Sequence, residues 1–428
     1  MRLRTVWRTR ATGNGPLSRD LRSTWLVVGA LSVTVTVAYG VLQYAFGVLL
    51  PSMQEDLGWS RTEITGAFSV ALLVSAAAGL FVGPLLDRHS PRLLMTTGAA
   101  AAALLVVGWS RVETVAGLYL VFAALGVTMA TLLYEPVFTV VTRRFFARRR
   151  AALTTVTLVG ATASLIFSPL TERLEASLGW RDALVVLAAI LAVVAVPLHA
   201  LVLRSAPNDG AATDPRKGRG TTRRLLTSAS FWLLGGAFAL ASFSMYAILV
   251  HLVSLLIESG SSPAFAAFAA GLVGISQLPG RLVFGLLGPR VGLAALPAAV
   301  FGLGAAALVL LAAERSEWAA VIFAVGFGAS NGMATLLRAT LVADLWGRER
   351  YGSVLAAVSA PYNIARAAAP VGAALLVALG SYTMLLWILA TGTATAAVAG
   401  RLAVDRARPA ADAAGHRLDD SSESIRGA

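Results

Sequence analysis

The sequence predicts an all-α membrane protein with twelve transmembrane helices in two six-helix halves that repeat one another. Three observations support this prediction. The 428 residues are 57% hydrophobic and only 13% charged, whereas soluble globular proteins carry roughly 25% charged residues. Twelve apolar segments are close to the length of about 20 residues that a membrane span requires, and together they occupy most of the chain. Loop residues of the first half also recur in the second half at a nearly constant offset.

The apolar segments define six predicted spans in each half. Those of the first half cover residues 25–50, 62–86, 93–110, 115–142, 151–175 and 181–203. Those of the second half cover residues 231–257, 264–288, 292–313, 318–342, 352–378 and 383–403. The segments lack the polar–apolar alternation of strands in a membrane barrel. Because the first segment is too long for a signal-peptide core and no small-residue cleavage site follows it, we interpret it as an uncleaved span.

Three polar segments flank or connect the two halves. Residues 1–24 form an arginine-rich N-terminal tail, and residues 204–230 form a basic linker that contains turn-forming residues. Residues 404–428 form a C-terminal tail whose polar composition is typical of disorder. The predicted domains are therefore a first bundle over residues 25–203 and a second bundle over residues 231–403.

The positions of the basic residues predict the orientation in the membrane. With the N-terminus inside, 27 of the 35 Lys and Arg residues fall in cytoplasmic segments, 5 in external loops and 3 within spans. Cytoplasmic loops of membrane proteins carry this kind of positive excess. We therefore expect a multi-pass protein of the cell membrane with both termini in the cytoplasm. The net charge of +13 follows from this topology and does not indicate nucleic-acid binding.

An internal repeat relates the two halves. Gly83 corresponds to Gly285 and Arg150 corresponds to Arg350, at offsets that stay between 200 and 202 residues along the chain. Six spans per half give both repeats the same orientation in the membrane. Parallel repeats of this kind are found in transporters, where substrate sites lie between the repeats.

The loop after the second span carries a motif. Gly83, Leu85, Asp87 and Arg88 occupy matching positions of G-x-L-x-D-R-x-G-R-R/K, so this loop resembles the signature of the major facilitator superfamily. A carboxylate at this helix end can pair with an arginine or cap the N-terminus of another helix. Asp87 and Arg88 are therefore candidate gating residues. The second copy of the motif has Pro289 in place of the acidic residue.

Further segments resemble one group within this superfamily, the monocarboxylate porters and oxalate–formate antiporters. They cover residues 143–150, 179–181, 250–252, 280–281, 344–350 and 380–382. The resemblance implies the major facilitator fold and a secondary active transporter that works by alternating access. It also implies a small organic anion as substrate, in particular a monocarboxylate, with Arg281 of the eighth span as the partner of its carboxylate.

Charged side chains inside spans indicate a functional site, because each costs roughly 2.5–3.5 kcal/mol at the centre of a span. Arg281 lies near the middle of the eighth span, and Gln277 lies one turn earlier on the same face. Its planar guanidinium suits bidentate binding of a carboxylate, with pairing to Glu135 or a position at the interface as alternatives. Arg366 in the eleventh span is a candidate anion contact or an interhelical tie, and Arg338 in the tenth span is expected to be structural.

Other polar residues within spans complete the candidate sites. Gln43 and Tyr44 in the first span and Asn331 in the tenth are candidates for the cavity wall, with packing or interhelical hydrogen bonds as the alternatives. His251 in the seventh span and Glu135 in the fourth are candidate proton carriers. Their alternatives are a packing histidine and an arginine partner. These two residues motivate the hypothesis of proton symport.

Several chemistries are not supported by the sequence. It contains no cysteine, which excludes disulfides and Cys-ligated metals. Its only lysine is not part of a phosphate-binding loop, no Gly-x-Ser-x-Gly elbow occurs, and the four histidines form no metal-spaced pair. We therefore expect no enzyme activity, metal or cofactor. We expect a monomer whose partners are a small-molecule substrate, the lipid bilayer and protons. Export of hydrophobic compounds or drugs is the alternative function, because the same fold supports it.

Overall fold

The computed structural model describes residues 16–145, 148–203, 227–347 and 350–426. Within these ranges every regular element is a helix, and twelve helices are long and apolar enough to cross a membrane. The predicted all-α fold with twelve spans is therefore confirmed. Most of the predicted N-terminal tail and residues 204–226 of the predicted linker lie outside the described residues.

Three of the six spans in the first bundle are interrupted. The uninterrupted spans are α3 (Arg61–Arg88), α4 (Pro91–Ser110) and α9 (Trp180–Val202). The first span consists of α1 (Pro16–Tyr39), the π-helical turn η1 (Gly40–Tyr44) and α2 (Ala45–Leu57). The fourth span consists of α5 (Val115–Leu132) and α6 (Tyr134–Arg144), and the fifth of α7 (Arg149–Ala161) and α8 (Ala163–Leu178).

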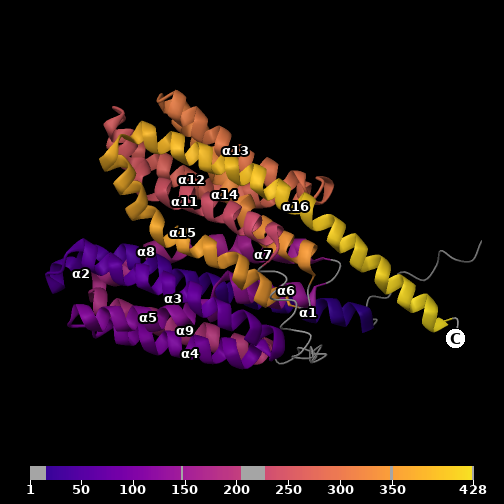
Figure 1. Ribbon diagram of the computed structural model, residues 1–428. Helices are drawn as coiled ribbons and strands as arrows, with labels where there is room; N and C mark the ends of the chain where they lie inside the picture. Colours follow the sequence, from indigo (N-terminus) through magenta and orange to yellow (C-terminus); the bar gives the residue numbers. More distant parts are fainter. Residues whose placement is uncertain (1–15, 146–147, 204–226, 348–349, 427–428) are drawn as a thin grey trace, which may run out of the picture.

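Each span of the second bundle is one continuous helix. They are α11 (Ala229–Glu258), α12 (Pro263–Leu287), α13 (Ala295–Ala313), α14 (Glu317–Trp346), α15 (Tyr351–Leu379) and α16 (Tyr382–Arg426). A short 3-10 turn, η3 (Gly288–Arg290), follows α12. Figure 1 shows the first bundle in indigo to magenta and the second in salmon to yellow.

The last helix corrects one prediction from the sequence. The membrane-length part of α16 ends at Ala407, but the helix continues to Arg426 and projects beyond the bundles (Figure 1). The disorder predicted for the described part of the tail is therefore wrong. Alanine has the highest helix propensity and recurs in the first half of this segment, up to Ala414. An ion pair of 3.7 Å between Arg401 and Asp405, four residues apart, adds to helix stability.

A local cause explains one interruption, and a close contact between helices accompanies another. Leu133 adopts an extended backbone between α5 and α6, three residues before Pro136, which has no N–H to donate within a helix. In η1, Gly40 faces Phe167 of α8 so closely that an added Cβ would lie 2.1 Å from the ring Cγ. Only a residue without a side chain permits this approach of the first and fifth spans.

The two bundles contact each other mainly through two helix pairs, α3 with α15 and α7 with α12. We call the side where α3 ends at Arg88 and α11 begins at Ala229 the linker side. Backbones meet there: a Cβ added to Gly83 of α3 would lie 2.4 Å from the carbonyl oxygen of Gly352 of α15.

The apolar core is shared between the bundles only on the linker side. One cluster of buried residues there combines both bundles, and it includes Val137 and Phe138 with Leu337 and Val354. A second cluster uses residues between 37 and 196 only, and a third uses residues between 247 and 390 only. Within the described residues the bundles are thus joined on the linker side and have separate cores toward the opposite side.

Candidate functional site

A cavity of about 530 Å³ lies between the two bundles. The first bundle contributes residues of η1, α6 and α8, among them Gln43 and Ser164, and the second contributes residues of α11, α12, α14 and α15. Tyr134 and Phe238 line the cavity and also belong to the apolar cluster that both bundles share. The cavity therefore borders the region where the bundles meet.

The cavity carries a net positive charge. Its described lining includes three guanidinium groups, Arg281, Arg338 and Arg366, and one carboxylate, Glu135, so its formal charge is +2. Charges act strongly where protein and lipid lower the effective dielectric constant. This cavity consequently favours an anion over a cation.

Arg281 on α12 is buried, with 5% of its surface exposed. Its Nη1 donates a hydrogen bond to the backbone oxygen of Thr157 on α7, which ties the bundles together. Its Nε has no partner among the described residues. Gln277 lines the same cavity one turn earlier. Arg281 thus retains donor capacity for an acceptor in the cavity.

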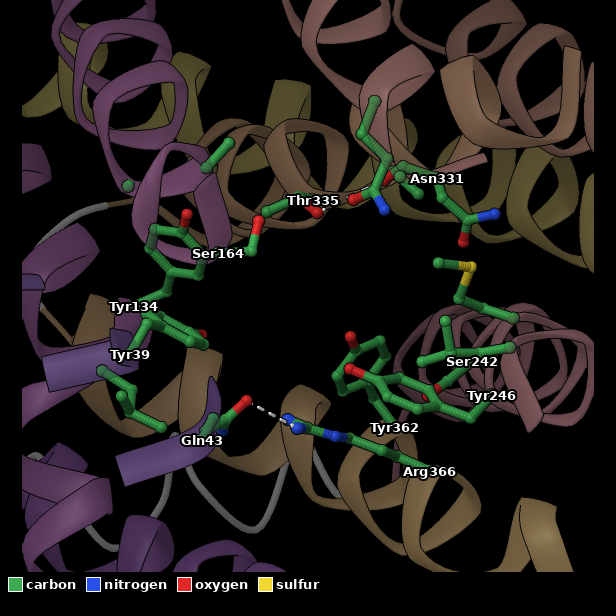
Figure 2. Close-up of a pocket in the computed structure, with 18 of the residues that line it drawn as sticks. Tyr39, Gln43, Tyr134, Ser164, Ser242, Tyr246, Asn331, Thr335, Tyr362 and Arg366 are labelled. Carbon is green, nitrogen blue, oxygen red and sulfur yellow. Dashed lines mark hydrogen bonds between the residues drawn. The ribbon is translucent and has the colours of Figure 1, made fainter. Parts of the chain in front are cut away.

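Arg366 on α15 reaches across the cavity toward the first bundle. Its Nη2 donates a hydrogen bond of 2.9 Å to Oε1 of Gln43 (Figure 2). Its guanidinium carbon lies 4.7 Å from the centre of the Tyr246 ring, a favourable cation–π contact. Nε of Arg366 and Nε2 of Gln43 have no partners in the described part of the chain. The partners of Arg366 named here, Gln43 and Tyr246, are neutral, so they do not compensate its positive charge.

Glu135 pairs with Arg338, and no ion pair with Arg281 is observed among the described residues. Oε1 of Glu135 on α6 lies 3.3 Å from Nη2 of Arg338 on α14. The Arg338 guanidinium also lies 4.0 Å from the centre of the Tyr362 ring. Both members of the pair line the cavity, so Arg338 is a residue of the candidate site as well as a contact between bundles.

Of the remaining residues predicted from the sequence, two line the cavity and one does not. Tyr44 and Asn331 line the cavity, and Nδ2 of Asn331 also donates to the backbone oxygen of Phe327 in its own helix at 2.9 Å. His251 is not among the lining residues. Its Nε2 lies 3.4 Å from the backbone oxygen of Pro370, so it connects α11 with α15.

Asp87 and Arg88 lie on the linker side and away from the cavity. Oδ1 of Asp87 accepts a hydrogen bond from the backbone N–H of Gly352 at 2.9 Å. Oδ2 accepts from the backbone N–H of Ser353 at 2.7 Å and from its hydroxyl at 2.6 Å. The carboxylate thereby caps the N-terminus of α15 in the other bundle. Arg88 is exposed.

The second contact between the bundles uses a different acidic residue. Pro289, the counterpart of Asp87, has no carboxylate. Near the α7–α12 contact, Asp344 at the end of α14 instead pairs with Arg149 and with Arg150, the latter at 3.1 Å. Both contacts on the linker side therefore contain an acidic residue that bridges the bundles.

Sequence reasoning does not single out two tyrosines of the cavity wall, Tyr134 and Tyr246. In Figure 2, Tyr39 and Tyr134 lie on one side of the open space, and Tyr246 and Tyr362 lie on the other. In the sequence, Tyr134 and Tyr246 are marked only by their position inside an apolar span, and packing in the core explains that position equally well.

This architecture, with two helical bundles around a central polar cavity, is that of a membrane transporter. Residues 32–337 match the family described as Major Facilitator Superfamily. The sequence is 26% identical to monocarboxylate transporter 13 of Rattus norvegicus, with 76% of each chain covered. It is 24% identical to an agnestins efflux protein of Paecilomyces divaricatus, with 83% of this chain and 81% of the relative covered.

A solved structure shows the same fold. The major facilitator transporter FucP in the outward conformation superposes with a TM-score of 0.72, over 89% of this chain and 99% of FucP, at 15% identity. The chain belongs to the major facilitator superfamily. It is a multi-pass membrane transporter and not an enzyme.

Proposed function

We propose that this protein is a secondary active transporter of small organic anions, in particular monocarboxylates, that works by alternating access. The observation that carries the proposal is the pair of cavity arginines, Arg281 and Arg366, that have no acidic partner among the described residues. Relatives named monocarboxylate transporters, at 26% and 27% identity, support the substrate class.

The proposed site divides the substrate contacts between both bundles. Arg281 binds the carboxylate, and the Gln277 amide on the same face of α12 binds a neighbouring oxygen. Arg366, held by Gln43, supplies the second positive charge. Tyr44 and Asn331 form further parts of the wall. A ligand held in this way touches both bundles, as alternating access requires.

We place the protein in the cell membrane as a monomer, with the linker side and both termini in the cytoplasm. The excess of basic residues in the linker-side segments supports this orientation. With this orientation the structure is closed toward the cytoplasm. Asp87, which caps α15 across the closed contact, then acts as a cytoplasmic gate, and Arg88 beside it is the second proposed gating residue.

We also propose proton coupling. Glu135 is the carboxylate of the cavity wall, and His251 is a second titratable group at the contact between α11 and α15. The proposal predicts that an inward proton gradient drives uptake of the anion into proteoliposomes. Uptake that is indifferent to the gradient would exclude the coupling while leaving anion transport intact.

The test of the function is uptake by purified protein in liposomes, with labelled acetate, lactate, pyruvate and benzoate as substrates. We expect Arg281→Ala to reduce uptake at least about tenfold, because a hydrogen bond to a charged group contributes roughly 1.5–3 kcal/mol. Arg111→Ala, which removes an exposed arginine of a loop, is the matched control and should transport normally. Full uptake by correctly inserted Arg281→Ala would refute the anchoring role.

A second candidate function is export of hydrophobic compounds. Apolar residues such as Leu72, Met245 and Ile275 also line the cavity, and one relative is named an efflux protein. This function predicts that overexpression raises resistance of cells to apolar toxins. It also predicts that Arg281→Ala keeps this resistance, whereas the anion proposal predicts no resistance with either protein.

A further inference from the structure

We propose that the cavity binds carboxylates that carry an apolar tail, such as decanoate, and that the tail lies in an opening between α8 and α12. The inference rests on the proposed anion transport and names the chemical class of the substrate more closely. In this arrangement a short anion such as acetate or lactate occupies only the inner end of the site.

The cavity reaches the surface of the protein mainly on one side. Among the described residues that line it, six are exposed, and four of these six lie on α8 and α12. They are Leu165 of α8 and Gly271, Gly274 and Ile275 of α12, which we call the side opening. By contrast, the lining residues of α3 and α15 are all half-buried. The cavity is therefore open between the fifth and eighth spans and not between the second and eleventh.

The side opening begins where the fifth span is interrupted. Before the break, α7 contacts α12, and the backbone oxygen of Thr157 accepts a hydrogen bond from Arg281. After the break, α8 packs against α2, α9 and η1 of its own bundle. A hydrogen bond from Ser52 of α2 to Glu175 holds the far end of α8 there. The two spans therefore separate beyond Arg281.

The space beside α12 is open and lies at the depth of the lipid chains. A Cβ added to Gly271 or Gly274 would meet no atom within 4 Å. Gly274 lies about 16 Å along α12 from its first residue, Pro263, near the middle of a hydrocarbon layer of about 30 Å. Leu165 and Ile275, which are 59% and 56% exposed, border this space. Because the side chains of the side opening have no hydrogen-bonding group, an apolar occupant fits there and a polar one does not.

The inner end of the same cavity is positively charged. Arg281 follows Gly274 by seven residues, so both lie on the same face of α12, about 10 Å apart along its axis. The Arg281 side chain is buried, and its Nε has no partner among the described residues. Ser164, the neighbour of Leu165, borders the open space in Figure 2.

A molecule with a carboxylate at one end and an alkyl chain at the other matches both ends of this site. Its carboxylate binds the Arg281 guanidinium, which is suited to bidentate pairing. Its chain extends along Gly274 and Gly271 and leaves the cavity between α8 and α12, where it contacts Leu165, Ile275 and lipid. An anion that is polar along its whole length would lose hydrogen bonds to water there without replacing them.

The first test compares tail lengths. Unlabelled acetate, butyrate, hexanoate, octanoate and decanoate compete with uptake of labelled lactate into proteoliposomes. We expect the inhibition constant to fall at least about tenfold from acetate to decanoate, because each added methylene removes apolar surface from water. Decanol, which has the tail without the charge, should compete much more weakly than decanoate. Inhibition constants that do not depend on tail length would overturn the proposal.

A variant that fills the side opening distinguishes binding there from partition into the bilayer. Gly274→Leu places a side chain in the open space, so we expect it to raise the inhibition constant of decanoate at least about tenfold and to leave that of acetate nearly unchanged. Gly302→Leu is the matched control, because a Cβ added to Gly302 of α13 also meets no atom within 4 Å. It should change neither constant. An equal effect of Gly274→Leu on acetate and decanoate would overturn the side opening as the site of the tail.

A photoreactive probe tests the natural protein without any variant. Decanoate with a diazirine at the end of its chain is added to the detergent-solubilised protein and irradiated, and the attachment sites are mapped by mass spectrometry. We expect attachment on α8 and α12 at the side opening, and we expect excess octanoate to suppress it. Attachment spread over the lipid-facing helices of both bundles, unaffected by octanoate, would overturn the proposal.

The possible failures separate the inference from the proposed function. If lactate is taken up but decanoate competes no better than acetate, the tail site is wrong and anion transport stands. If none of the acids is taken up but the probe attaches at the side opening, the binding site stands and the proposed transport of these anions is wrong. If neither uptake nor attachment at the side opening is observed, both are wrong.

Discussion

A neutral side chain at position 43 determines how much positive charge the cavity presents. The carbonyl oxygen of Gln43 accepts a hydrogen bond from Arg366 and leaves its charge uncompensated. At the other arginine contact with the first bundle, the carboxylate of Glu135 compensates Arg338. Two nearly isosteric acceptors, an amide and a carboxylate, thus give the two arginines different electrostatic roles.

Gln43→Glu should therefore weaken anion binding. The new carboxylate would neutralise Arg366 and reduce the formal cavity charge, so we expect KM for the transported anion to rise about tenfold or more. This change corresponds to about 1.4 kcal/mol. Gln43→Met, which removes the acceptor without adding charge, is the matched control and should change KM less. Equal KM values for the two variants would contradict the electrostatic role of position 43.

The sequence predicts the members of the site better than their contacts. Arg281, Gln277 and Arg366 line the cavity because a polar residue in an apolar span is unfavourable unless it faces a polar space. The same reasoning cannot tell which face of α11 meets the cavity, and His251 lies against α15 instead. The partner of Glu135 comes from the other bundle, more than 200 residues away in sequence, where helical periodicity carries no information.

At the scale of elements, span positions follow from hydropathy but interruptions do not. The fourth span is predicted over 115–142 and occurs as α5 and α6, with the break at Leu133. Leucine is a good helix former, so only the nearby Pro136 indicates irregularity. The π-helical turn at Gly40–Tyr44 has no sequence signature. Both breaks carry cavity residues, and π-helical turns such as η1 occur frequently at functional sites.

The cap that Asp87 forms on the N-terminus of α15 leads to a prediction about gating. Asp87→Asn keeps an acceptor but removes its charge, and neutral hydrogen bonds are weaker than charged ones by roughly 1 kcal/mol each. Three such hydrogen bonds weaken together, so we expect the linker side to open roughly 100-fold more often. Because the protein has no cysteine, a single Ser359→Cys beneath the closed contact can report opening through its rate of maleimide labelling in detergent.

The control for the gate is a cysteine that closure does not cover. Thr62→Cys lies at the exposed start of α3, and its labelling rate should be the same with Asp87 and with asparagine at position 87. If Asp87→Asn leaves the labelling of Ser359→Cys unchanged, the cap on α15 does not hold the linker side closed.

At the scale of the whole molecule, the distribution of the core describes one state of a transport cycle. A shared apolar cluster joins the bundles on the linker side, and separate clusters hold each bundle together elsewhere. The sequence cannot distinguish this state from one that opens on the linker side. The same spans contact lipid in both, so hydropathy and basic residues are identical for each.

Alternating access predicts that a crosslink on the linker side stops transport. A Cβ added to Gly285 of α12 would lie 3.5 Å from Cβ of Thr154 on α7, which fits the separation of roughly 3.5–4.5 Å in disulfides. We expect the double variant Thr154→Cys/Gly285→Cys to transport when reduced, to stop when oxidised and to recover with reductant. Each single cysteine variant is the control, and transport by the fully crosslinked protein would contradict rocking of the bundles.

The backbone contact between Gly83 and Gly352 has a consequence for the entropy of the transport cycle. Ordering a long side chain costs up to about 2 kcal/mol, whereas glycine has no side chain to order. Each closure of this contact therefore immobilises no rotamer, and each opening releases none. The two end states then differ little in side-chain disorder at this position.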